Sequence, residues 1–120
     1  MSGKTKTEQK RSGDRGERLT AWYLRLRGYR IIERNWRSHH KEVDIIASRG
    51  RVIAFVEVKT RAASAVVPPA YSVTAQKQAN VIAAAKAYAL LHDVGGRSVR
   101  FDVAEVVGGK VNYIKNAYHG

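Results

Sequence analysis

The 120-residue sequence contains no cysteine, which excludes disulfide bonds and thiolate metal sites. Long apolar runs are also missing, and none approaches the ~18 residues that a membrane-spanning helix needs. The N-terminal stretch "MSGKTKTEQKRSGDRG" lacks the apolar core of a secretory signal. We therefore expect a cytoplasmic protein without membrane association, and the length predicts one compact domain.

Acidic residues are scarce in this chain. Its 10 Asp and Glu residues face 22 Lys and Arg residues, which gives a net charge of +12. Such an excess favours a polyanionic partner, most often nucleic acid. Binding to an anionic membrane surface is one alternative, but it would need a basic amphipathic helix or a long apolar segment. The second alternative is that the arginines serve only to keep the surface hydrated.

The hydrophobic pattern predicts an α/β domain with the element order α-β-β-β-α-β-β. Residues 1–13 are polar and basic without periodicity, so we expect them to form a disordered arm that precedes a single domain over residues 14–120. We expect helices over 14–27 and 75–92, and strands over 29–36, 42–48, 52–60, 99–107 and 110–118. The predicted sheet is mixed, has about five strands, and is flanked by helices.

The third expected strand changes character along its length, from "IAFV" to "EVKTR". Residues 52–56 form an unbroken apolar run, which is typical of a central strand covered on both faces. Glu57 and Lys59 follow at positions i and i+2, so their side chains point to the same face. An isolated pair of this kind is usually a surface ion pair of little energetic value. The position of this pair, at the end of a buried strand, makes it a candidate site.

Two further acids lie on the preceding strand, in "EVDIIAS". Glu42 and Asp44 share one face of that strand. We expect the hairpin to turn on Arg49-Gly50. Asp44 and Glu57 are then diagonal neighbours, roughly 7–8 Å apart at the backbone. A slip of one residue would send Asp44 to the other face, so the predicted site depends on this register.

Clustered carboxylates repel one another, and burial increases that repulsion. A shared proton or a divalent cation relieves it. Hard oxygen ligands without cysteine indicate Mg²⁺, with Mn²⁺ as a substitute. Mg²⁺ sites commonly use one or two carboxylates and leave the other positions to water and substrate phosphate. Lys59 beside such an ion could hold or activate the attacking water, or neutralise the phosphate.

Three stretches, "GERLTAWYLRLRGYRIIERNW", "EVDIIA" and "FVEVKTR", resemble in order and spacing the bacterial YraN-like family. That family is placed by similarity among the PD-(D/E)xK nucleases, near the archaeal Holliday-junction resolvases, and the likeness covers about residues 14–118. It implies a restriction-endonuclease-like core and a Mg²⁺-dependent endonuclease that acts on DNA rather than RNA, with branched or junction DNA as a candidate substrate. Since resolvases of this fold act as dimers, the resemblance also suggests a homodimer.

The resemblance also implies roles for individual residues. Asp44, Glu57 and the backbone carbonyl of Val58 match the metal ligands of these nucleases. Lys59 matches the lysine of the E-x-K motif. Glu17 matches a glutamate on the first helix of the resolvase-like branch, and it completes the predicted catalytic set.

Other positions match the family less closely. Glu42 fits the YraN-like pattern but not the resolvases, which leaves a secondary ligand and a structural role both open. In the loop after the third strand, Val67 replaces a family glycine and Tyr71 replaces a glutamate. The start of the second helix, residues 74–77, resembles a family motif that contacts phosphate. The basic residues expected at the nucleic-acid interface are Arg18, Arg25, Arg34, Arg37, Arg61 and Lys77.

The leading hypothesis is therefore a Mg²⁺-dependent DNA endonuclease. A catalytically silent nucleic-acid-binding adaptor of the same fold is the alternative, and a ribosome-associated RNA-binding protein is a third hypothesis. Both account for the positive charge. Neither accounts for the clustered carboxylates, because binding a phosphate backbone does not require them.

Overall fold

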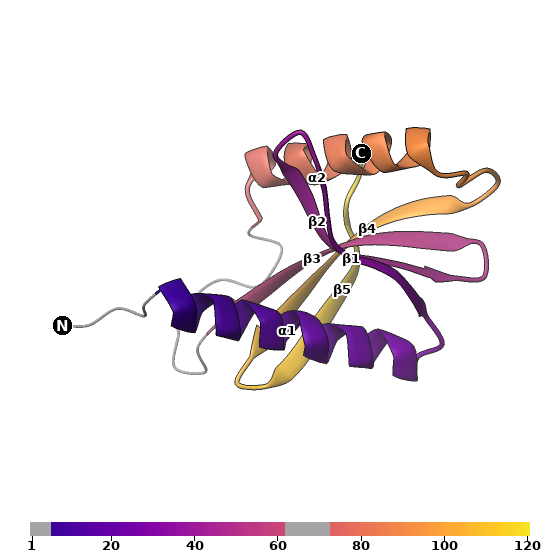
Figure 1. Cartoon of the computed structure of the whole chain (residues 1–120). Helices are drawn as coiled ribbons and strands as arrows, with labels where there is room; N and C mark the ends of the chain where they lie inside the picture. Colours follow the sequence, from indigo (N-terminus) through magenta and orange to yellow (C-terminus); the bar gives the residue numbers. More distant parts are fainter. Residues whose placement is uncertain (1–5, 62–72) are drawn as a thin grey trace.

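The computed structural model describes residues 6–61 and 73–120, and Figure 1 shows their arrangement. The chain order of the elements is α-β-β-β-α-β-β, as the sequence predicts. The elements are α1 (Lys6–Leu26), β1 (Arg30–Ser38), β2 (Lys41–Arg49), β3 (Val52–Arg61), α2 (Ala75–Leu91), β4 (Ser98–Val107) and β5 (Lys110–Tyr118). The loop positions Val67 and Tyr71 lie outside the described residues.

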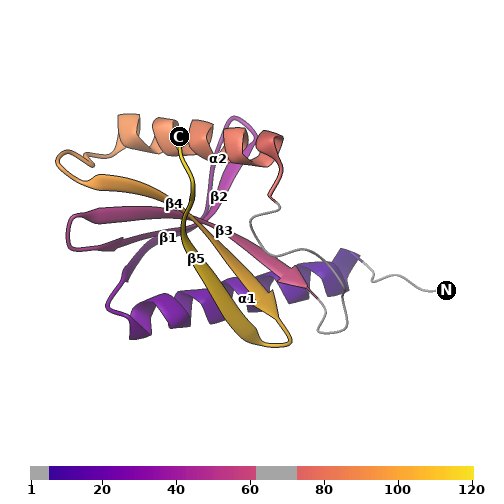
Figure 2. The same cartoon turned by 180° about the vertical axis from the view of Figure 1, so that it is seen from behind.

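The five strands form one mixed sheet in the order β1-β2-β3-β4-β5. β3 and β4 run parallel, and every other neighbouring pair is antiparallel. Figures 1 and 2 show α1 on one side of the sheet and α2 on the other. The prediction of a mixed five-stranded α/β fold is confirmed, and the arrangement is consistent with a restriction-endonuclease-like core.

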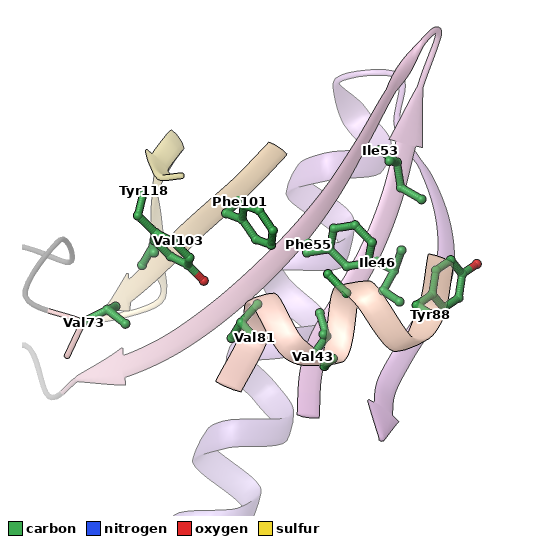
Figure 3. Close-up of a cluster of buried hydrophobic side chains, with 12 residues drawn as sticks. Val43, Ile46, Ile53, Phe55, Val73, Val81, Tyr88, Phe101, Val103 and Tyr118 are labelled. Carbon is green, nitrogen blue, oxygen red and sulfur yellow. The ribbon is translucent and has the colours of Figure 1, made fainter. Parts of the chain in front are cut away.

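Strand β3 contributes side chains to two separate hydrophobic cores, one on each face. Ile53 and Phe55 belong to the core under α2, whereas Ala54 and Val56 belong to the core under α1. The sequence prediction of a central strand covered on both faces is therefore confirmed. Figure 3 shows the α2-side core, in which the Phe55 ring lies 5.9 Å from the Tyr88 ring, centroid to centroid.

Helix α1 begins earlier than predicted, at Lys6 instead of residue 14. Part of the segment expected to be a disordered arm is therefore helical, while residues 1–5 lie outside the described residues. The stretch "KTEQKR" at the start of α1 is rich in Lys, Glu, Gln and Arg, which are strong helix formers. The helix propensity of these residues extends α1 in this stretch, although they lack the apolar stripe from which a helix over 14–27 is predicted.

A glycine brings α1 close to the end of β3. A Cβ atom added to Gly16 would lie 2.1 Å from Oγ1 of Thr60, so a larger residue has no room there. One turn further on, the hydroxyl of Thr20 donates a hydrogen bond to the carbonyl of Gly16 at 2.8 Å. This close approach places Glu17, the next residue of the helix, beside the sheet.

The hairpin between β2 and β3 differs from the predicted one by two residues. Arg49 pairs with Val52, so the turn consists of Gly50 and Arg51 instead of Arg49-Gly50. Gly50 adopts a φ of +56°, a conformation that glycine tolerates best, at the first turn position. Because side chains alternate with a period of two, a shift of two residues keeps Ile45 and Ile46 on their predicted faces. Val43 is an exception, because it packs with Ile46 in the core under α2 instead of sharing the face of Ile45.

The β1–β2 hairpin is tighter than predicted. Ser38 pairs with Lys41, so the turn contains only His39 and His40, both with positive φ. The sequence predicts a longer loop because it does not show these two left-handed residues.

Neither helix in the described part of the chain is long and apolar enough to span a bilayer.

Candidate metal centre

Strand β2 separates from β3 next to Asp44. The ladder between the two strands runs from Arg49–Val52 to Ile45–Val56, and one more step would place Asp44 level with Glu57. At this point Oδ2 of Asp44 accepts a hydrogen bond from the backbone N–H of Val58 at 2.8 Å. Asp44 therefore lies beside the Glu57–Val58 segment, at the level where an extended ladder would place it opposite Glu57 instead of diagonal to it.

Both carboxyl groups are buried, and the charge of Asp44 disfavours ionisation of Glu57. The exposed fraction is 8% for Asp44 and 6% for Glu57. Burial and the charge of Asp44 raise the pKa of Glu57 to about 8. Burial also raises the pKa of Asp44, while the hydrogen bond from Val58 and the charge of Lys77 oppose that rise. Because its pKa is raised, the Glu57 carboxyl retains a proton near neutral pH when no metal ion is bound.

The Glu57 carboxyl group has few polar partners among the described residues. Its Oε1 atom is buried and has no hydrogen-bond donor among the described residues. Its Oε2 atom lies 3.6 Å from the ammonium nitrogen of Lys77. A buried oxygen without a donor is costly unless something else compensates it, and a divalent cation would do so.

The backbone of Val58 fits the same metal site. The N–H and C=O groups of one strand residue point to the same side of the strand. Since the N–H of Val58 points to Asp44, its carbonyl oxygen also faces the gap that β2 leaves open. In residues 6–61 and 73–120, no three His, Cys, Asp or Glu side chains are grouped closely enough to hold a metal ion. The candidate ligand set is therefore two carboxylates and one carbonyl, which suits Mg²⁺.

Lys77 lies inside the candidate centre, although the sequence assigns it only to the nucleic-acid interface. The Oγ1 atom of Thr74 caps α2 by accepting a hydrogen bond from the backbone N–H of Lys77 at 3.1 Å. The cap fixes Lys77 in the first turn of α2, from which its side chain reaches Glu57. Lys77 lowers the pKa of Glu57 more than Lys59 does. Lys59 is half-buried on β3, where its charge also favours the ionised form of Glu57.

Glu17 lies at the border of this centre. Burial, together with the charge of Asp44, raises the pKa of Glu17 to about 7, while Asn35 and Arg34 oppose that rise. Its Oε1 atom lies 3.6 Å from the Arg34 guanidinium, and the exposed fraction of its side chain is 12%. The structure therefore brings Glu17 within electrostatic range of Asp44, as the site prediction requires.

A cavity of about 620 Å³ opens beside Glu17. Its lining residues are Gly13, Asp14, Glu17, Asn35, Arg37 and Glu42. Glu42 forms an ion pair with Arg37 in which the Nε–Oε2 distance is 2.6 Å. The Glu42 charge raises the pKa of Asp44. Glu42 is therefore tied to an arginine at the edge of the site and acts on Asp44 at a distance.

The basic residues predicted for the nucleic-acid interface fall into two groups. Arg34, Arg37, Arg61 and Lys77 each form an ion pair with an acid. The Arg61 pair is the most enclosed, because its Nε lies 2.8 Å from Glu105 on β4 and the exposed fraction of the Arg61 side chain is 17%. Arg18 and Arg25 are exposed on α1, where the Arg25 guanidinium lies 5.3 Å from the centre of the Trp22 ring.

Comparison with known proteins identifies relatives over most of the chain. The profile of a family described as "Uncharacterised protein family UPF0102" matches residues 16–106. A UPF0102 protein of Alkaliphilus metalliredigens is 44% identical over 109 residues, which cover 88% of this chain and 96% of the relative. A UPF0102 protein of Persephonella marina is 40% identical over 88% of this chain and 91% of its own length. One from Chlorobaculum parvum is 45% identical, with 83% and 78% covered.

Proposed function

Because the chain belongs to the UPF0102 family, the YraN-like group that its motifs resemble, we propose that it is a Mg²⁺-dependent endonuclease that hydrolyses phosphodiester bonds of DNA. One observation carries this proposal. Two buried carboxyl groups, those of Asp44 and Glu57, meet where β2 leaves β3, and one buried oxygen there lacks a hydrogen-bond donor among the described residues. A net charge of +12 favours a polyanionic substrate.

The residues present fit a single Mg²⁺ ion. Asp44, Glu57 and the carbonyl of Val58 would hold it, and Mn²⁺ would be able to replace it. When bound, the ion supplies Lewis-acid polarisation of the phosphoryl oxygen and a bound water of lowered pKa. Its charge also removes the repulsion that keeps a proton on the acid pair.

The side chains of the protein supply the remaining functions. Lys59 and Lys77 both act on Glu57, so either ammonium can orient the attacking water or neutralise a phosphate oxygen. Glu17, with its pKa near neutrality, is suited to accept or donate a proton at the same border. The exposed Arg18 and Arg25 would bind the DNA backbone, which gives affinity without sequence reading.

A nuclease panel tests the proposal. Duplex, flap, four-way-junction and single-stranded DNA are incubated with the full chain and Mg²⁺ or Mn²⁺, and branched DNA is the substrate that the resemblance favours. We expect Asp44→Asn and Glu57→Gln each to abolish cleavage while the circular dichroism spectrum is unchanged. Asp93→Asn is the matched control, because Asp93 is exposed and follows the C-terminal end of α2, whereas Lys77 lies in the first turn of this helix.

Two outcomes would contradict the proposal. Cleavage by Glu57→Gln at the wild-type rate would remove the acid pair from the reaction. Tight DNA binding by the wild type, with no cleavage of any substrate in either metal, would favour the silent adaptor instead. If the wild type cleaves DNA, parallel assays with Lys59→Met and Lys77→Met show which ammonium group the reaction uses.

A further inference from the structure

Asn35 has an unusual backbone in the middle of an edge strand. Its φ is +54°, whereas strand residues normally have negative φ. Its neighbours Arg34 and Trp36 pair with Ile45 and Val43, so the same step places Asn35 opposite Asp44. The left-handed residue therefore lies at the level where β2 leaves β3. Such outliers often mark functional positions.

Two consecutive residues of β1 act on the same carboxylate. Asn35 and Glu17 line the same cavity, where the Asn35 side chain lowers the pKa of Glu17, and the Arg34 guanidinium lies 3.6 Å from Oε1 of Glu17. In a regular strand, adjacent side chains point to opposite faces and cannot meet at one group. The left-handed conformation of Asn35 breaks this alternation, so both side chains reach Glu17. Asparagine is the residue type, after glycine, that adopts this conformation most readily.

We infer that Asn35 is a positioning residue that holds the Glu17 carboxylate beside Asp44. Its backbone turns its amide toward Glu17, and the amide together with Arg34 fixes the carboxylate on the wall of the 620 Å³ cavity that Asn35 and Glu17 both line. The consequence for catalysis rests on the proposed nuclease function. The consequence for the position of Glu17 does not.

The chain contains a natural control for this inference. Asn116, on β5, also has a φ of +54° within a strand. Its backbone N–H donates to Oδ1 of Asp102 at 2.8 Å, so there the left-handed conformation serves a main-chain hydrogen bond. Asn116 lines a different cavity, of about 320 Å³, which includes none of the candidate site residues.

Substitution of Asn35 by glycine separates the contribution of its backbone conformation from that of its side-chain amide. Glycine adopts positive φ without strain, so Asn35→Gly keeps the backbone and removes only the amide. We expect kcat for DNA cleavage to fall roughly tenfold to a hundredfold, as for a catalytic group that is slightly misplaced, while KM is unchanged. Asn116→Gly is expected to cleave at the wild-type rate.

A double-mutant cycle with Glu17→Gln shows whether Asn35 acts through Glu17. If it does, Asn35→Gly lowers kcat in the wild-type background and has no further effect in the Glu17→Gln background. An equal loss in both backgrounds, or a wild-type kcat for Asn35→Gly, would overturn the inference. Asn35→Asp is the second variant, because it tolerates the same backbone conformation but cannot donate to a carboxylate.

A crystal structure of Asn35→Gly decides the question without any activity. We expect the Glu17 carboxylate to turn away from Asp44 while the main chain of β1 keeps its course. A Glu17 carboxylate that does not move would overturn the inference even if the wild type cleaves DNA. If the wild type cleaves no substrate, the nuclease proposal is wrong. The inference about Asn35 is then still tested by whether Glu17 moves in the Asn35→Gly structure.

Discussion

Two regions of the sheet contain buried carboxyl groups, and they differ in the hydrogen-bond donors that surround those groups. Asp102, on β4, has an exposed fraction of 0%, yet its oxygens are fully satisfied. Arg100 donates to both of them from Nε, at 2.9 and 3.1 Å, and Arg100 also reaches Oδ2 from its NH2 group at 2.9 Å. The hydroxyl of Tyr113 and the backbone N–H of Asn116 donate to Asp102 as well.

The Asp44–Glu57 pair is buried almost as deeply, but it has fewer hydrogen-bond donors among the described residues, where Asp44 accepts one bond from Val58. Glu57 has one ammonium at 3.6 Å and a buried oxygen without a donor among the described residues. Fixed donors around a buried carboxylate make it a structural group, because its charge is already compensated. A buried carboxylate short of donors must take up a proton or a cation. This difference, more than burial itself, identifies the candidate site.

The largest expected effect comes from removing the charge of Asp102. Asp102→Asn leaves Arg100 without its buried partner, and breaking such a pair lowers the free energy of unfolding by about 3–5 kcal/mol. Urea denaturation of the variant and the wild type at pH 7 measures the difference. A loss below about 1 kcal/mol, the usual value for an exposed pair, would contradict a structural role for Asp102.

Replacing an acid by its amide in the Asp44–Glu57 pair should change the free energy of unfolding in the opposite direction. Glu57→Gln removes a charge that burial and Asp44 disfavour, since they raise the pKa of Glu57 to about 8. We expect the free energy of unfolding to rise by about 1–3 kcal/mol at pH 8, because each unit of raised pKa corresponds to about 1.4 kcal/mol. The measurement is again urea denaturation, without divalent metal. Destabilisation of Glu57→Gln would show that the two regions do not differ in the way described.

The raised pKa values of Glu57 and Glu17 should make the stability of the protein depend on pH. The folded protein holds protons on Glu57 and Glu17 up to pH about 8 and about 7, whereas the unfolded chain releases them near their ordinary pKa of 4.5. Between these values the folded state binds more protons, so the free energy of unfolding falls as pH rises. For Glu57 alone the slope is up to about 1.4 kcal/mol per pH unit. Denaturation of Glu57→Gln from pH 5 to 8 should give a shallower slope, and an identical slope would contradict this.

The smallest effect compares two glycines of α1. Gly13 has no atom within 4 Å of an added Cβ, so Gly13→Ala should stabilise the protein by about 0.5–1 kcal/mol through helix propensity. A Cβ atom on Gly16 would lie 2.1 Å from Oγ1 of Thr60, so Gly16→Ala should lose that gain and shift Glu17 away from the sheet. Thermal denaturation measures both changes. Equal stabilisation by the two variants would show that α1 does not depend on this contact to place Glu17.

The sequence predicted the arrangement of the acids because it depends on local alternation. Glu57 and Lys59 lie at i and i+2 of β3, and Asp44 lies beside them, bonded to the N–H of Val58, although the hairpin register differs from the predicted one by two residues. Hydrophobic periodicity does not predict the start of α1, because the first turns of this helix form through residue propensity and carry no apolar stripe.

The sequence could not distinguish the two carboxylate regions. Arg100 and Asp102 are two residues apart on one strand, like Glu57 and Lys59, but Asp102 also accepts hydrogen bonds from Tyr113 and Asn116 of β5, which the local sequence pattern does not predict. Lys77 reaches Glu57 only because α2 begins beside the end of β3. The left-handed Asn35 had one signal, an asparagine inside a strand pattern, where that residue type is rare.

Manganese binding followed by electron paramagnetic resonance tests the central claim most directly, because it reports the ion and requires no substrate. On titrating the wild type with Mn²⁺ at pH 7.5, the six-line signal of the free ion should be suppressed until one site is filled. Glu57→Gln should leave the signal at its protein-free amplitude, while Asp93→Asn should behave as the wild type. A wild-type titration that follows the protein-free line at every concentration would contradict a dication site at Asp44 and Glu57.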